Sequence, residues 1–162
     1  MITETRMITL FQGDPKLFLD ERGSYLEWIG GQCVMDAGLE NAVFISLFTT
    51  LEPKNSPRGW AGNYLWENKD YWIGSRFEAA LNEPITLSAL TNAEDEAKKA
   101  LDWMIEKNLA SSIEVTVTNP VGPQIYTKIR IQPPDLPIQE LLLIKNGVNW
   151  IFQIQDPAYR RF

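Results

Sequence analysis

The run Asp36-Ala-Gly-Leu-Glu-Asn-Ala-Val-Phe-Ile-Ser-Leu-Phe-Thr49 opens the stretch, residues 36–84, around which this chain is organised. Its apolar side chains recur at intervals of three and four residues and fall on one broad face, which predicts a helix. They are Leu39, Val43, Phe44, Leu47 and Phe48. Asp36 is a candidate N-cap for this helix, and the prolines from Pro53 onward predict that the chain leaves it as a loop.

Two short glycine-containing runs follow the predicted helix, Pro57-Arg-Gly-Trp-Ala-Gly62 and Ile73-Gly-Ser-Arg-Phe77. The loop from Leu51 to Tyr71 is long for a compact domain and rich in Trp and Tyr. These aromatic side chains either cover the edge of the core or form a contact surface, since Trp, Tyr and Arg often anchor interfaces. We expect the glycines to serve backbone freedom or close approach, because no Lys-Ser/Thr pair follows them to complete a phosphate site.

The composition is that of an ordinary soluble globular protein, with 162 residues, 44% of them hydrophobic and 22% charged. The net charge of −6 argues against nucleic-acid binding and favours protein partners. The chain has no histidine and a single cysteine, Cys33, which excludes an internal disulfide and a cysteine-based metal cluster. We therefore expect no metal and no cofactor. No apolar stretch approaches the roughly 20 residues of a membrane span, and the N-terminus lacks the apolar run of a signal peptide, so we expect a cytoplasmic protein without a membrane partner.

A second, longer helix is predicted after Pro84 by an amphipathic stripe at intervals of three and four residues. The stripe consists of Leu87, Leu90, Ala93, Ala97, Leu101, Met104 and Ile105. Thr86 and Thr91 are both candidate N-caps, and Lys107 is placed at the end as the helix dipole prefers.

Strands are predicted on either side of these helices. Residues 6–12 and 25–29 are expected to pair as an N-terminal hairpin, and residues 113–117 and 125–131 alternate by two and predict an antiparallel pair around the turn 119–123.

Near the C-terminus, the runs 141–144 and 150–154 flank Asn146-Gly147, which is typical of a hairpin turn. The fold class is therefore α+β, a small mixed or antiparallel sheet with two main helices and a C-terminal strand hairpin.

The order and spacing of these motifs resemble a known family. Gly38-Leu-Glu-Asn-Ala-Val-Phe-Ile-Ser-Leu-Phe-Thr49, Arg58-Gly-Trp-Ala-Gly62, Ile73-Gly-Ser-Arg-Phe77, Leu81-Asn-Glu-Pro84 and Ile113-Glu-Val-Thr-Val117 together resemble the small baseplate protein of Mu-like contractile-tail phages. That family resembles a branch of the lysozyme-like baseplate wedge family of T-even phages.

The resemblance covers residues 30–132. It implies one baseplate wedge-like domain over residues 1–162, with its core at 30–132, the N-terminal hairpin at 6–29 and the C-terminal hairpin at 141–154.

The resemblance implies a structural protein rather than an enzyme. The expected role is to join the baseplate wedge to the tail sheath around a sixfold tail and to initiate sheath assembly, first in the host cytoplasm and then in the virion. Its partners would be other wedge proteins and the sheath protein. The wider family contacts the wedge through a Glu-Pro-Arg motif, but residues 106–108 here read Glu-Lys-Asn. The expected partner-binding residues are instead those of the two glycine-containing runs, namely Arg58, Gly59, Trp60, Gly62, Gly74, Ser75 and Arg76.

Several alternatives stand beside this reading. Arg58 and Arg76 either contact partner carboxylates or form internal salt bridges that fix the loop. An exposed edge strand is a template for a sheath strand, and residues 125–131 and 150–154 are the candidate edges. A lysozyme-like glycosidase needs two convergent carboxylates, and a soluble protein-binding regulator is the third possibility. The acids near the central stretch are Glu40, Glu52, Glu67, Asp70, Glu78 and Glu83.

Overall fold

The structure is a computed structural model, and it divides the chain into two compact units, residues 1–43 and 44–162. The described residues are 17–20, 23–26, 28–33, 39–51, 59–60, 63, 65, 68, 72–134 and 137–154. Helix α1 (Leu39–Phe48) crosses the boundary between the units. This helix confirms the one predicted from the apolar spacing, while its candidate cap Asp36 lies outside the described residues.

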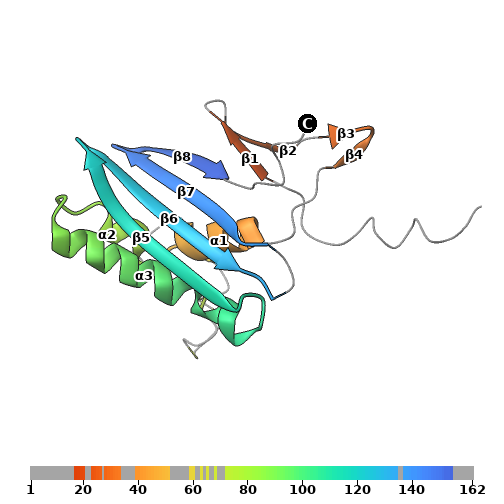
Figure 1. Ribbon diagram of the computed structural model, residues 1–162, viewed down its shortest axis with the longest axis horizontal. Coiled ribbons are helices and arrows are strands. Elements are labelled where there is room, and N and C mark those ends of the chain that lie inside the picture. The colour runs from red at the N-terminus through yellow and green to blue at the C-terminus, as the bar shows by residue number, and fades with distance from the viewer. Residues whose placement is uncertain are drawn as a thin grey trace, which may run out of the picture. The chain divides into compact units, whose positions relative to one another are not determined.

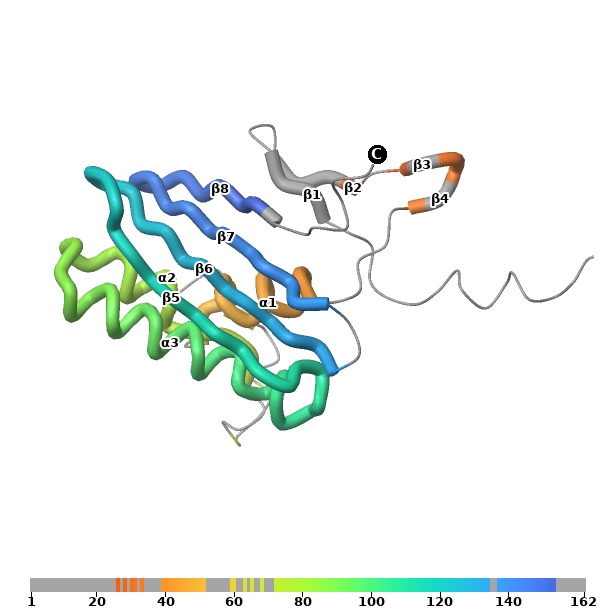
Figure 2. Tube along the Cα trace, viewed as in Figure 1, coloured from red at the N-terminus to blue at the C-terminus, as the bar shows by residue number. Residues whose placement is uncertain are grey.

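The second unit is built on a four-stranded antiparallel sheet. Its strands are β5 (Ser112–Val121), β6 (Gln124–Gln132), β7 (Gln139–Asn146) and β8 (Asn149–Ile154), and each pairs with the next along the chain (Figure 1). The helices of this unit lie on one face of the sheet, as the trace shows (Figure 2), and α3 contacts β5. The predicted α+β class and the C-terminal hairpin are confirmed.

The strand order assigns the edges of the sheet. Strand β6 is paired on both sides, with β5 and with β7, so the prediction of an edge at residues 125–131 is wrong. The reason is non-local, because the apolar run of β7 adds to β6 on the side away from β5. Residues 150–154 belong to β8, the last strand in the order, so among the described residues that predicted edge is confirmed.

Two of the three connections in the sheet, from β5 to β6 and from β7 to β8, are tight turns. The turn predicted at residues 119–123 is reduced to Gly122-Pro123, and Asn119 and Pro120 lie within β5. The Asn119 side-chain amide donates to the carbonyl oxygens of Gly122 at 2.8 Å and of Gln124 at 2.6 Å, which closes this turn. Gly147, with φ +61°, turns the chain from β7 to β8.

Helix α3 (Leu87–Glu106) packs on the sheet through small side chains. Its buried residues are Ala89, Ala93, Ala97, Leu101 and Met104. Alanines at 89, 93 and 97 fall one turn apart on one face, so the helix can approach the strands closely.

At both ends of α3, the structure differs from the apolar face that the sequence predicted. The hydroxyl of Thr86 accepts a hydrogen bond from the Ala89 N–H at 3.1 Å, so Thr86 is the cap and Thr91 lies inside the helix. Leu87 follows the cap and is 82% exposed, and Ile105 at the other end is also exposed. Both were predicted to be buried, and both lie off the face that the alanines define.

A short helix, α2 (Phe77–Ala80), comes between α1 and α3 and was not predicted. With α1 and β8 it forms an aromatic cluster in the second unit. The ring of Phe48 lies 6.1 Å from that of Phe77 and 4.9 Å from that of Trp150. Phe44 and Phe152 extend the cluster, with ring centroids 5.0 Å apart. Phe77 is fully buried, so α2 is held by its first residue.

The first unit contains two short hairpins. Strand β1 (Leu17–Asp20) pairs with β2 (Gly23–Leu26), and β3 (Trp28–Ile29) pairs with β4 (Gln32–Cys33). The strand predicted at residues 25–29 is therefore split between two hairpins.

The split has a local cause at Gly30 and Gly31, which have φ of +59° and +81°. Two consecutive positive φ values fit a two-residue hairpin turn, which pairs Trp28 and Ile29 forward with β4. The other predicted strand of the N-terminal hairpin, residues 6–12, lies outside the described residues.

Candidate interaction surface around Thr50

Thr50 brings the two glycine-containing runs together. Directly after α1, this residue forms parallel bridges to Gly59 of the first run and to Ser75 of the second. The Ser75 N–H donates to the Thr49 carbonyl oxygen at 2.9 Å, and the Leu51 N–H donates to the Ser75 carbonyl oxygen at 3.2 Å. Residues 63–72 separate the two runs in the sequence, and the fold brings Gly59 and Ser75 to the same residue.

Gly74 allows this close approach. A Cβ atom at position 74 would lie 2.6 Å from the Thr49 carbonyl oxygen and 2.9 Å from the Leu51 nitrogen, and the backbone φ is +128°. Neither the space nor the conformation suits an L side chain. The sequence-based expectation that a glycine here serves close approach is confirmed for this position.

Ser75 is a buried connector between helices. Its hydroxyl donates to the Leu47 carbonyl oxygen in α1 at 2.7 Å and accepts from the Phe77 N–H at the start of α2 at 3.2 Å. It thus supplies a partner to a carbonyl near the end of one helix and to a free N–H at the start of another. Because Ser75 is buried, it can support a partner contact only indirectly, by holding the neighbouring backbone in place.

Asn63 fixes the loop between the runs and was not singled out from the sequence. This side chain is 2% exposed; its amide group donates to the carbonyl oxygens of Leu51 at 3.3 Å and Ile73 at 2.9 Å, and its oxygen accepts from the Ile73 N–H at 3.0 Å. Its own N–H donates to the Trp60 carbonyl oxygen at 3.0 Å. The signal in the sequence is an asparagine directly after Gly62, a residue type that bonds backbone groups in turns.

The side chains that point outward from this framework are mainly apolar. Trp60 is 51% exposed and Leu65 is 83% exposed, while Ile73 and Arg76 are also exposed. Of the predicted contact residues, Arg58 and Gly62 lie outside the described residues. The structure therefore brings together Gly59, Trp60, Gly74, Ser75 and Arg76, and it presents Trp60 on backbone that Thr50 and Asn63 hold from both sides.

Lys145 anchors β7 to the connection between α2 and α3. Its buried ammonium group donates to the Leu81 carbonyl oxygen at 2.6 Å and to Oδ1 of Asn82 at 2.7 Å. Burial lowers the pKa of this group, and the nearby charge of Glu78 opposes that shift. Lys145 therefore acts as a structural cross-link between β7 and this connection.

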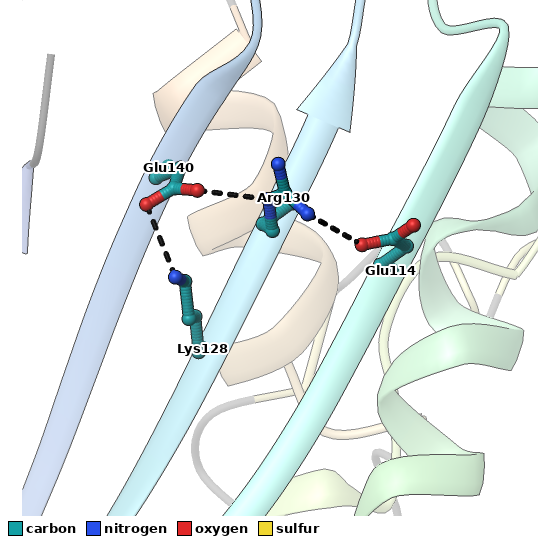
Figure 3. A network of polar contacts seen from close by, with 4 residues as sticks. All are labelled: Glu114, Lys128, Arg130 and Glu140. Atoms are coloured by element: carbon teal, nitrogen blue, oxygen red, sulfur yellow. Dashed lines mark hydrogen bonds and ion pairs between the residues drawn. The ribbon is translucent and has the colours of Figure 1, made fainter. Parts of the chain in front are cut away.

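A second polar group lies on the face of the sheet opposite the helices. Arg130 of β6 has Nη1 3.0 Å from Oε2 of Glu114 on β5 and Nε 2.8 Å from Oε1 of Glu140 on β7 (Figure 3). The Nε contact is an ion pair without good hydrogen-bond geometry. Lys128 lies 3.2 Å from Glu140 and is the main reason that the pKa of Glu140 is lowered. The two carboxylates and the two basic groups balance, so the network itself has no net charge.

Glu94 and Glu140 do not have the pKa of a glycosidase general acid. The pKa of each carboxyl group is lowered, chiefly by a lysine hydrogen bond. A general acid needs the opposite shift. Glu52, Glu67 and Asp70 lie outside the described residues. Within the described residues, no cluster of three or more His, Cys, Asp or Glu is placed to hold a metal ion.

The family follows from comparison with known proteins. The model of the family described as "Phage protein GP46" matches residues 39–137, which is more than half of the chain. The chain belongs to this phage protein family. The match begins at the first residue of α1 and includes Thr50, Asn63, Gly74 and Lys107.

A named relative agrees with the family. The Mu-like prophage FluMu protein gp46 of Haemophilus influenzae (strain ATCC 51907 / DSM 11121 / KW20 / Rd) is 30% identical over 102 residues, which cover 63% of this chain and 73% of the relative. No solved structure matches. In the part of the chain that the structure describes, none of the helices has the length and apolar character needed to cross a membrane.

Proposed function

We propose that this GP46-family protein is a structural component of a contractile phage tail that joins the baseplate wedge to the tail sheath. Membership of a phage protein family and the Mu-like prophage relative support this role. The proposed partners are the other wedge proteins and the sheath protein, arranged around a sixfold tail. The protein would reside in the host cytoplasm during assembly and in the baseplate afterwards.

The surface around Thr50 is the proposed wedge contact. It would include Arg58, Gly59, Trp60, Gly62, Gly74, Ser75 and Arg76. The observation that carries this proposal is the half-exposed indole of Trp60 on backbone fixed by Asn63. A large aromatic side chain on fixed backbone buries much apolar surface and orders little of the chain on binding, which is how interface anchors contribute. Arg76 would supply charge complementarity at the rim.

The β8 edge is the proposed sheath contact. The two edges of the sheet differ, because the Val117 N–H on β5 already donates to Oε2 of Glu94 on α3 at 3.2 Å. Strand β5 also has Pro120 and an irregular register between Thr118 and Val121, features that discourage pairing. Strand addition is therefore favoured at β8.

The hairpin turn indicates which β8 groups a partner strand would meet. Asn146 and Asn149 are paired across the two-residue turn, and such a closing pair is hydrogen-bonded in tight hairpins. Because bonded pairs alternate, we expect the backbone groups of Trp150 and Phe152 to point away from β7. A sheath strand would then hydrogen-bond these two residues, whose side chains lie in the aromatic cluster.

Immunogold labelling of purified phage particles tests the role. With antibody against this chain, we expect label at the sheath-proximal baseplate. Label elsewhere on the particle would contradict the wedge-to-sheath role, and particles without label would contradict a structural role altogether. A peptidoglycan zymogram and a host-protein pull-down would then decide between the glycosidase and the regulator.

Lysine substitutions test the β8 edge. The double variant Ile151→Lys/Gln153→Lys changes two exposed residues of β8, and added lysines discourage pairing at an edge. We expect purified baseplates to contain this variant but to nucleate little sheath. The matched control, Thr116→Lys/Thr118→Lys, places the same charges on exposed positions of β5 and should leave sheath assembly unchanged. Equal sheath assembly by both variants would exclude the β8 edge.

A further inference from the structure

The N-terminal hairpins have more exposed apolar surface than such small elements can support alone. Strands β1 and β2 have four residues each, and β3 and β4 have two each. A two-stranded hairpin is at best marginally stable in water. Yet Leu26 is 43% exposed and Trp28 is 64% exposed.

Trp28 is displayed by a turn with defined geometry. Gly30 and Gly31 form the two-residue turn between β3 and β4, which pairs Trp28 with Cys33. A Cβ atom added at either glycine would meet nothing within 4 Å, so the turn stands in open space. Such a turn fixes the backbone beside the indole and leaves room for another surface to approach.

The charge of this unit restricts what that surface can be. Residues 1–43 contain three basic and seven acidic residues, a formal charge of −4, whereas residues 44–162 contain twelve basic and fourteen acidic residues, a formal charge of −2. A second copy of the same unit, an anionic membrane and a nucleic acid would all be repelled. An apolar pocket with lysine and arginine at its rim would be attracted.

We propose that the N-terminal hairpin unit is a docking arm that inserts Trp28 and Leu26 into an apolar, basic-rimmed pocket of a partner protein in the assembled tail. The hairpins of this unit, residues 17–33, lie outside the matched residues 39–137 of the family, so the arm is a contact in addition to those proposed for Trp60 and β8. Tryptophan is the side chain most enriched at interface positions that dominate binding. The location of the partner in the tail rests on the proposed function, while the arm itself rests on the hairpins, the exposed indole and the charge.

Purified tails assembled with variant protein test the arm. Full-length Trp28→Ala or Leu26→Ala would be supplied to a phage that lacks its own copy, and the amount of the chain per tail would be measured. We expect Trp28→Ala to lower it about tenfold or more and Leu26→Ala to lower it less. Leu87→Ala is the matched control, since Leu87 is an exposed leucine in the other unit and should be incorporated as the parent chain is.

A charge variant provides an independent readout. Asp20→Lys reverses a charge in β1, and we expect this variant to be incorporated several-fold less than the parent chain. We also expect added salt to lower the incorporation of the parent chain, because salt screens the attraction between the acidic arm and a basic rim. If Trp28→Ala lowers the melting temperature of the free chain, its reduced incorporation could reflect lost stability, and the incorporation of Asp20→Lys then tests the docking arm instead.

The outcomes separate the two proposals. If the parent chain is found in tails and both Trp28→Ala and Asp20→Lys are incorporated equally well, the docking arm is overturned and the baseplate role stays intact. Absence of the parent chain from tails would overturn the baseplate role and the arm with it. A change of oligomeric state of the free chain on Trp28→Ala, seen by analytical ultracentrifugation, would make a second copy the occupant and would also overturn the proposal.

Discussion

The backbone N–H of Val117 on edge strand β5 donates a hydrogen bond to Oε2 of Glu94 on α3, over 3.2 Å. Oε1 of the same carboxylate accepts from the Lys98 ammonium at 2.6 Å, so the helix holds the carboxylate in place over the strand. This contact ties α3 to the sheet at a backbone group that strand pairing does not use. It also makes the two edges of the sheet different, because β5 is partly covered by its own helix.

This contact predicts a specific acid sensitivity. The Lys98 hydrogen bond, followed by the Val117 N–H, lowers the pKa of Glu94 below 4.5, although desolvation opposes the shift. The unfolded state therefore takes up the proton first as pH falls, and the stabilisation is present above 4.5 and lost as pH falls through the lowered pKa. We expect Glu94→Gln to lower the free energy of unfolding by about 1 kcal/mol at pH 7 and by less at about pH 3.

Urea unfolding at the two pH values measures this difference. Glu96→Gln is the matched control, because Glu96 pairs with Lys99 at 2.9 Å on the helix surface, and exposed pairs of this kind contribute little. An effect of Glu94→Gln that is the same at both pH values would show that the carboxylate charge has no role in holding β5.

Gly74 predicts a large effect from a single methyl group. Gly74→Ala would place Cβ 2.6 Å from the Thr49 carbonyl oxygen in a backbone conformation that L side chains rarely adopt. We expect a loss of about 2–4 kcal/mol in the free energy of unfolding. At Gly147, with φ +61° and nothing within 4 Å of a Cβ, alanine should cost only about 1 kcal/mol. Equal losses in denaturant titrations of the two variants would mean that the contact with Thr49 is easily relieved.

Removing the Asn63 side chain should destabilise the loop between the two glycine-containing runs. Asn63→Ala removes three side-chain hydrogen bonds, to Leu51 and twice to Ile73, and should lower the free energy of unfolding by about 2–3 kcal/mol. In hydrogen exchange, the Ile73 amide should lose protection beyond that global change, because its acceptor is gone. Asn92→Ala, an exposed change on α3, should affect neither quantity. Retained protection at Ile73 would show that the loop is held by its other contacts.

The elements that the sequence predicted are those with local signals. The spacing of apolar residues predicted α1 and α3, alternation predicted β5 and β6, and apolar runs on either side of Asn146-Gly147 predicted β7 and β8. Helix α2 was missed because four residues are too few to show a period, and its position depends on the burial of Phe77. The error over β6 arose because alternation says which face of a strand is buried but not which strands lie beside it.

The same distinction applies to the site. The role of Gly74 followed from its residue type, since glycine is suited to close approach, but what it approaches is set by the bridge between Thr50 and Ser75. Asn63 reads in sequence as an ordinary turn residue. Its partners are 12 and 10 residues away, at Leu51 and Ile73, and the fold alone brings them into reach.

Lys145 predicts a second pH-dependent change in stability, at the alkaline end of the pH scale. Burial lowers the pKa of its ammonium group below 10.5 in the folded state, with Glu78 opposing the shift. Between the lowered pKa and 10.5 the unfolded state binds more protons, so this residue contributes more stability as pH rises through that window. Lys145→Met keeps the length of the side chain and removes the titration and the donor to Leu81 and Asn82.

We therefore expect Lys145→Met to cost about 1–3 kcal/mol at pH 7, because two acceptors lose their donor, and to cost more at about pH 10.5, the upper end of that window. Urea unfolding at both pH values measures the difference. Lys128→Met, which removes an exposed lysine from the opposite face, should show a small cost. If the cost of Lys145→Met shrank as pH rose, attraction to Glu78 would outweigh burial at this site, and the cross-link to the α2–α3 connection would be mainly electrostatic.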